Sequence, residues 1–329
     1  MLHRVKESDL ASQDFWVLDE IHMCANPQTR RTHLLYGFLK SLLPKYLLGL
    51  SGSIMRNDPK NLWVPIALCT LNPKATSGLT LTGNLAKYWA FARHFSNVEK
   101  IRLGRGRTVE KFTGVRIDRL PELRALLAQK IVRYKIEDVM KELPELVRIP
   151  VSVPLARVPG LEEEWEAFQA GRKTDSTAKR LSAEIKAPHT AEYIRHIRDA
   201  GSGPILCFTV HPEAARTIAE NIPNSVVISG STPMDFRAEA VRRYQAGDID
   251  CIVATCGALG VGVTLTRGNV VVFNDLPWVP ADLEQCEARV RRIGQLHTVF
   301  SHVIESSEID RRISEVLLQK SSSIKQVFE

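Results

Sequence analysis

The sequence predicts an α/β fold in two lobes, each built on an open parallel sheet. Two observations carry this prediction. Short apolar runs that end at small or acidic residues recur in both halves of the chain, and such runs are typical of buried parallel strands. Amphipathic helical stretches separate these runs, which is the alternation expected of an open α/β sheet.

The first lobe is expected to begin with a strand, a helix and a second strand. They are expected at residues 15–18 (FWVL), about 32–43, and 46–50 (YLLGL). The first strand stops at the acidic pair Asp19 and Glu20, and the second stops at Ser51. Strands that end at small or acidic residues and alternate with a helix are typical of an open α/β sheet.

A helical insertion rich in basic residues is expected over about 81–146, with an exposed arginine-containing loop in IRLGRGRT. A short strand over 147–153 follows it. The second lobe is expected to contain strands at 205–208, 226–229, 251–254 and 270–273, and helices near 190–199, 282–292 and 308–319.

These patterns divide the chain into four parts. They are a partial first lobe at 1–80, a helical insertion with a return strand of that lobe at 81–155, a linker at 156–185, and a second lobe at 186–329. The polar run GRKTDSTAKR at 171–180 is the reason for placing a solvated linker there.

Charge and cysteine usage limit the class of protein. Lys and Arg number 44 against 37 Asp and Glu, giving a net charge of +7 and a pI of about 9.1. A basic excess favours a polyanionic partner, although a soluble protein can also simply be basic. The six cysteines form no C-x-x-C pair and fit neither a zinc site nor a disulfide framework. With no apolar signal or membrane segment, an intracellular protein without membrane association is expected.

The acidic pair has a chemical interpretation. Asp19 at the end of a strand could hold Mg²⁺ through water, and Glu20 beside it could orient a water that attacks a phosphate. A polar turn after a strand is the alternative. Ser51 could relay movement between a nucleotide site and another surface, or belong to an ordinary turn.

A glycine-rich loop follows the strand at 251–254. Gly260 and Gly262 would let the backbone approach a ligand closely. The hydroxyls of Thr264 and Thr266 could contact phosphates, and the alternative is a flexible turn.

The most specific signal is the run Gln285 to Gln295. Arg289 and Arg292 are three residues apart, so a helix would present both on one face, and Gly294 would end that helix. Two guanidinium groups can neutralise charge that develops on a γ-phosphate. A solvated basic face is the alternative, and it applies most to Arg291.

Taken in order, these elements resemble motifs II, III, V and VI of superfamily-two helicases, and in detail the Swi/Snf-type DNA translocases. The matching segments are Asp19-Glu20-Ile21-His22 with Asn26-Pro27, Leu50-Ser51-Gly52-Ser53 (Ser for the family's Thr), Asn61-Leu62-Trp63, Leu71-Asn72-Pro73, Glu142-Leu143-Pro144, Lys186-Ala187-Pro188, Asp275-x-x-Trp278-x-Pro280, and Gln285 to Gln295. The resemblance spans about residues 14–305.

The resemblance implies two RecA-like lobes of the P-loop NTPase type, with ATP and Mg²⁺ between them and duplex DNA as partner. It implies Mg²⁺ binding by Asp19, water activation by Glu20 and completion of the site by Arg289 and Arg292. The remaining roles it implies are lobe coupling or nucleotide binding by His22, Ser51, Gly260, Gly262 and Gln285, and DNA contact by Thr209, Thr264 and Trp278. Trp278 could equally be a core residue.

One departure from the family is large. The Walker A loop, G-x-x-x-x-G-K-[ST], is absent from the sequence, and only 18 residues precede Asp19. A truncated first lobe is therefore expected, completed by a separate P-loop-bearing chain, or else a truncated or split reading frame. ATP hydrolysis is expected only after completion. A non-enzymatic DNA-binding or regulatory module derived from a helicase, and an RNA helicase, remain alternatives.

Overall fold

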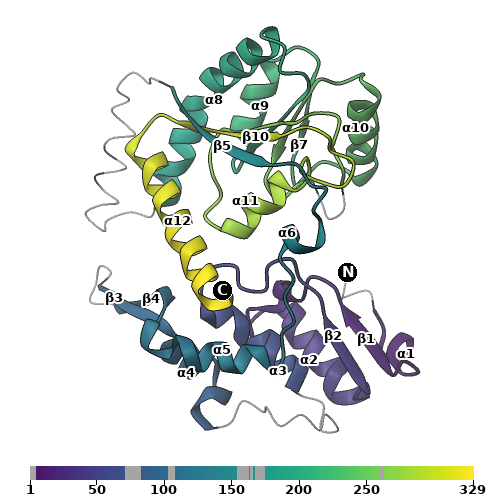
Figure 1. Ribbon diagram of the computed structural model, residues 1–329, viewed down its shortest axis with the longest axis vertical. Coiled ribbons are helices and arrows are strands. Elements are labelled where there is room, and N and C mark those ends of the chain that lie inside the picture. Colours follow the sequence, from purple (N-terminus) through teal and green to yellow (C-terminus); the bar gives the residue numbers. More distant parts are fainter. Residues whose placement is uncertain are drawn as a thin grey trace. The chain divides into compact units, whose positions relative to one another are not determined.

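The computed structural model describes residues 5–70, 83–102, 108–153, 163, 166, 175–259 and 263–329. The chain separates into two compact units (Figure 1). The first unit comprises Met1–Arg133 and Gln319–Glu329, and the second comprises Tyr134–Leu318.

The second unit contains a six-stranded sheet in which every strand pair is parallel. Its strands are β5 (Leu146–Ser152), β6 (Ile205–Thr209), β7 (Ser225–Ile228), β8 (Cys251–Thr255), β9 (Val270–Phe273) and β10 (Val299–Glu305), in the spatial order β5-β10-β9-β6-β8-β7. The four strands expected in this half are confirmed as β6 to β9. The α/β class expected from the strand and helix alternation is thus confirmed here.

Helices cover both faces of this sheet. They are α8 (Asp175–Asp199), α9 (Pro212–Glu220), α10 (Met234–Ala246), α11 (Pro280–Glu287) and α12 (Glu308–Phe328). Alternate residues of β6 serve opposite faces: Leu206 and Phe208 pack with α10, α11 and α12, whereas Ile205 and Cys207 pack with α9 and the second half of α8. Burial on both faces explains why these strands read as continuous apolar runs.

Two expectations for this region were wrong. The strand near 147–153 was expected to return to the first lobe, but β5 pairs with β10 throughout, from Leu146 opposite Val299 to Ser152 opposite Glu305. Within the expected linker, residues 175–185 form the first half of α8, where Ala178 and Ala183 are fully buried. The linker's remaining residues lie outside the described ones, apart from 163 and 166. Small alanines among polar residues gave no apolar stripe from which the helix could be predicted.

The first unit holds a parallel strand pair and a helical layer. Its main elements are β1 (Phe15–Leu18), α2 (Arg30–Leu42), β2 (Tyr46–Gly49), α3 (Trp63–Thr70), α4 (Tyr88–Phe95) and α5 (Leu120–Ala128). Both expected strands and the expected helix are confirmed. Trp16 of β1 packs with Leu35 and Leu39 of α2, while Phe91 of α4 belongs to a second cluster that includes Val327 of α12.

The other face of this strand pair is apolar and exposed. Phe15 and Val17 of β1 are 56% and 51% exposed, and their neighbours Tyr46 and Leu48 of β2 are 63% and 44% exposed. Within the described residues, neither strand pairs with a third. Parallel strands are ordinarily covered on both faces, so this "open face" (Phe15, Val17, Tyr46, Leu48) is unusual.

The expectation of a mostly helical insertion at 81–146 was partly wrong. Strands β3 (Ser96–Arg102) and β4 (Thr108–Val115) form an antiparallel pair in which Ile101 lies opposite Val109. Cross-strand apolar contacts of this kind stabilise the strand pair. They join residues that are not neighbours in the sequence, so the local pattern did not predict them. The arginines Arg105 and Arg107 of the expected loop lie outside the described residues. Among the helices that the structure describes, none is both long and apolar enough to cross a membrane.

Candidate functional site

In the first unit, the ends of β1 and β2 bring four of the predicted site residues to one edge. His22 Nδ1 lies 2.9 Å from Ser51 Oγ and 3.0 Å from Glu20 Oε2. Glu20 itself follows Asp19, whose Oδ1 accepts a hydrogen bond of 3.0 Å from the Glu20 amide. The parallel register of the two strands produces this meeting, because Leu18 pairs with Gly49 just before both polar segments.

The backbone turns sharply at Glu20. This residue has φ 53° and ψ 47°, a left-handed conformation that a residue with a Cβ rarely adopts. It begins a short 3₁₀ helix, Ile21–Cys24, which places His22 back towards the end of β2. Strained backbone of this kind is common at functional sites.

The acidic pair fits a magnesium ion held largely by water. Asp19 is exposed and Glu20 is partly buried. In the part of the chain that the structure describes, no group of three or more His, Cys, Asp or Glu side chains gathers as a metal site. Mg²⁺ differs from zinc in needing no such cage, because it keeps several waters and binds one or two carboxylates together with substrate phosphates.

In the second unit, the helix that was expected to carry both arginines ends early. Helix α11 stops at Glu287, and residues 288–295 continue as a series of turns, here called the arginine loop. Arg289 and Arg292 are therefore not on one helical face, which corrects the expectation. Gly294 has φ +97° in this loop, a conformation that glycine adopts without cost.

The arginine loop is fastened to the segment 263–268, which ends the glycine-rich loop. The Leu265 amide donates to the Arg289 carbonyl at 2.9 Å, and Arg292 Nη1 donates to the Val263 carbonyl at 3.1 Å. Gln295 Nε2 reaches the carbonyls of Thr266 and Gly268 at 3.2 and 2.8 Å. The two sequence signals of this unit, nearly 30 residues apart, thus form one structure.

The other predicted residues of this region differ in their surroundings. Gly260 and Gly262 lie outside the described residues. Gln285 is exposed on α11, and Thr264 is partly buried. Trp278 packs against the core of the second unit and has the Lys179 ammonium 5.1 Å from its ring centre, so the core alternative applies to much of its side chain.

Thr209 is not placed to touch DNA. Its side chain is fully buried, and its hydroxyl donates to Asp275 Oδ1. Asp275 also accepts from the Val210 amide, at 3.2 Å to each carboxylate oxygen. Direct DNA contact by Thr209 is therefore corrected: it joins the ends of β6 and β9 instead. Nearby, burial lowers the pKa of His211, while the Asp275 carboxylate opposes that shift.

Sequence reasoning missed Arg237 of α10. Its guanidinium donates to four carbonyls, those of Ser229, Gly230, Thr232 and Ala258, at 2.7 to 3.0 Å. These carbonyls belong to the loops that follow β7 and β8. An arginine three residues after Met234, in a stretch rich in other charges, gave no signal that distinguished it from a solvated one.

Comparisons with known proteins agree with these observations. Residues 188–294 match the family of helicase conserved C-terminal domains. The mouse DNA annealing helicase and endonuclease ZRANB3 is 28% identical over 222 residues, covering 61% of this chain and 21% of that protein. The bovine SWI/SNF-related matrix-associated actin-dependent regulator of chromatin subfamily A-like protein 1 is 27% identical over 312 residues, covering 88% of this chain and 30% of that protein.

Among solved structures, the Sulfolobus solfataricus SWI2/SNF2 ATPase core in complex with dsDNA gives a TM-score of 0.43 at 21% identity, covering 99% of this chain and 71% of that one. The chain spans less than a third of the length of the mouse and bovine relatives described above.

Proposed function

Because the chain is a SWI/SNF-type member of helicase superfamily two, with a RecA-like α/β second unit, we propose that it supplies the catalytic C-terminal part of an ATP-driven motor on DNA. The observation that carries the proposal is the fastening of the arginine loop to the segment 263–268. Such a link lets groups that sense phosphates move together with groups that contact DNA.

We assign the chemistry as follows. Asp19 holds Mg²⁺ through water, and Glu20 orients the attacking water. Bound Mg²⁺ would neutralise charge on the phosphates. Arg289 and Arg292 stabilise charge on the γ-phosphate, and His22 with Ser51 transmits changes at the acidic pair to the end of β2. Thr264, and the exposed part of Trp278, contact the DNA backbone.

The phosphate-binding loop is the remaining part of the proposed site. The sequence has no Walker A loop, so we propose that a separate P-loop-bearing polypeptide completes the first unit. Two features of the strand pair support this. Its open face presents four large apolar side chains that a further layer would cover, and within the described residues neither strand pairs with a third. An added parallel strand would bring its own carboxyl end to the edge where Asp19 and Glu20 lie.

A reconstitution experiment tests the proposed function. The chain is mixed with the P-loop-bearing polypeptide, and phosphate release is measured with and without duplex DNA. We expect no DNA-stimulated ATPase from the chain alone, and activity from the mixture. Arg292→Ala should lower kcat by about 10³-fold or more, as for other arginines that act on a γ-phosphate.

Arg312→Ala is the matched control, since Arg312 makes only an exposed ion pair with Glu315, at 3.2 Å, in the described contacts. It should leave phosphate release unchanged. A mixture that binds DNA but releases no phosphate under any condition would contradict the proposal. That result would favour the second candidate, a non-enzymatic DNA-binding or regulatory module. The observation that favours this candidate is that the sequence shows no Walker A loop. Comparing duplex DNA with duplex RNA separates a DNA motor from an RNA helicase.

A further inference from the structure

An ion pair between a half-exposed arginine and a buried glutamate joins β5 to the end of α11. Arg148 Nε donates to Glu287 Oε1 at 2.8 Å, and Arg148 Nη2 donates to Glu287 Oε2 at 2.7 Å. The Glu287 side chain is 2% exposed and that of Arg148 is 50% exposed. Two parallel charge-assisted hydrogen bonds fix both the orientation of the guanidinium and its distance from the carboxylate, which a single hydrogen bond does not.

A second contact lies on the other side of Arg289. Arg291 Nε donates to the Pro144 carbonyl at 2.7 Å. Glu287 comes two residues before Arg289, and Arg291 comes two residues after it, so both contacts flank the first arginine of the predicted pair. Both also end on one short segment, 144–148, through which the chain joins the sheet of the second unit.

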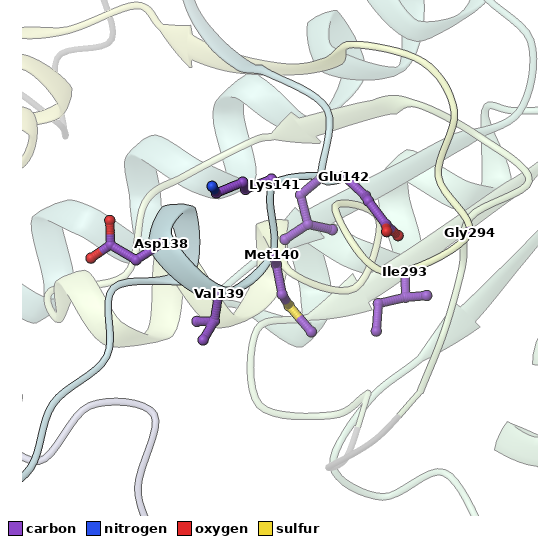
Figure 2. A pocket seen from close by; sticks show the side chains of 8 residues that line it. Asp138, Val139, Met140, Lys141, Glu142, Ile293 and Gly294 are labelled. Carbon is purple, nitrogen blue, oxygen red and sulfur yellow. The ribbon is translucent and has the colours of Figure 1, made fainter.

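The residues just before Pro144 line a cavity beside the arginine loop. A cavity of about 430 Å³ is lined by residues 138–143 together with Ile293 and Gly294 of the arginine loop (Figure 2). Met140 and Ile293 both contribute apolar side chains to its wall. In the described contacts, the polar links at this place are that of Arg291 to the Pro144 carbonyl and that of Glu287, at the end of α11, to Arg148.

We infer that Arg148, Glu287 and Arg291 form a clamp that positions Arg289 and Arg292 through contacts separate from those with the segment 263–268. This rests on the proposed function, in which those two arginines act on the γ-phosphate. Arg148, Glu287 and Arg291 are positioning residues, because they act through the arginine loop. The clamp also ties the chain that enters the second unit directly to the loop that carries the chemistry.

Arg148→Ala tests the clamp in the chain as it exists. It leaves Glu287 buried without its bidentate partner, so the arginine loop should open more often. We expect amide hydrogen exchange in residues 288–295 to accelerate by about tenfold or more, the factor that corresponds to ~1.4 kcal/mol. Arg148→Lys keeps the positive charge but cannot donate two parallel hydrogen bonds, so it should accelerate the exchange less than Arg148→Ala does.

Arg180→Ala is the matched control. Arg180 also pairs with a carboxylate, its Nη1 donating to both oxygens of Glu184 at 3.0 and 3.1 Å, but on the surface of α8. Exchange in residues 288–295 should be unchanged in this variant. Unchanged exchange in Arg148→Ala would overturn the clamp.

The reconstituted motor gives the functional readout. Because the arginines act on charge that develops during the reaction, Arg148→Ala should lower kcat by about tenfold and leave KM for ATP nearly unchanged. Faster exchange with an unaltered kcat would show a merely structural ion pair and overturn the positioning role. If the wild-type mixture releases no phosphate, the proposed function fails, and so does the positioning role that rests on it, while the exchange result still decides whether the contact holds the loop.

Discussion

Lys186 carries its amino group inside the second unit, where its side chain is fully buried. Its Nζ lies 2.7 Å from Asp310 Oδ1 and also donates to the Ile304 carbonyl at 3.1 Å. Asp310 in turn accepts from the amides of Ser306 and Ser307 at 3.0 and 3.1 Å. One buried pair therefore joins α8, the end of β10 and the start of α12.

Lys186→Met removes one partner and leaves the Asp310 carboxylate without its counter-charge. Breaking a buried pair in this way costs about 3–5 kcal/mol, so the free energy of unfolding should fall by that amount. Urea unfolding followed by circular dichroism measures it. Arg311→Ala, at an exposed position on the same helix α12, should change the value by less than about 0.5 kcal/mol. Equal effects of the two substitutions would contradict the account.

His302 is expected to make the free energy of unfolding depend on pH. Burial lowers the pKa of this imidazole below its ordinary value of 6.5, so the unfolded chain binds the proton more readily than the folded chain. Stability is then full above the unfolded pKa and falls as the pH drops through the window between the unfolded and the lower folded pKa. His302→Gln should flatten this loss, which for one proton is at most about 1.4 kcal/mol per pH unit. Thermal melts at several pH values below neutrality measure it, and the exposed His196→Gln should leave the slope unchanged.

Among the elements, the connection into β9 depends on a close backbone approach. A Cβ added at Gly268 would lie 2.2 Å from the Pro204 carbonyl oxygen, just before β6. The Gly268 carbonyl also accepts from Gln295 of the arginine loop. The position of the arginine loop is thus tied to the spacing of two central strands.

Gly268→Ala should therefore destabilise the second unit, because backbone rather than a flexible side chain must move. Overpacking of this kind costs about 1–3 kcal/mol or more. Gly257→Ala is the matched control, since a Cβ there would meet nothing within 4 Å. Denaturant midpoints of the two variants measure the difference, and a midpoint for Gly268→Ala equal to that of the native chain would rule out the steric argument.

Elements differed in how well the sequence predicted them. The strand β9 is apolar throughout, β6 and β8 are apolar up to a final threonine, and all three are buried at every position, so their pattern has one interpretation. Helix α11 was predicted to continue to residue 292, because Arg289 and Arg292 share helical spacing. It ends at Glu287, whose side chain pairs with Arg148, and the Arg289 carbonyl beyond it accepts from the Leu265 amide rather than from a further helical turn. Those partners are distant in sequence.

At the scale of the whole molecule, the excess of positive charge is the property that bears on the proposed binding to DNA. The chain has a net charge of +7 and a pI of about 9.1. Contacts between lysine or arginine and phosphate release counterions from the duplex, and they carry no base sequence. A motor that moves along DNA needs this kind of contact.

Duplex DNA binding should accordingly weaken with salt and ignore sequence. Neutralising only two phosphates lowers the association constant about tenfold over a fourfold rise in salt concentration. Fluorescence anisotropy with a labelled duplex, over a series of salt concentrations, measures the slope. A duplex of scrambled sequence is the control and should give the same slope. Binding that does not depend on salt would contradict a backbone-directed interaction.

The sequence by itself determined the α/β class and the strands whose ends carry the candidate residues, because apolar runs and their polar ends are local patterns. The meeting of His22 and Ser51 with the acidic pair came from the structure, where the two parallel strands end at one edge. Only the tertiary structure decided the sheet to which β5 belongs, the burial of Thr209, and the contacts of Arg148, Arg237 and Arg291. Each of these depends on a partner far along the chain, and an isolated arginine or threonine carries no local signal of the carbonyl or carboxylate it will meet.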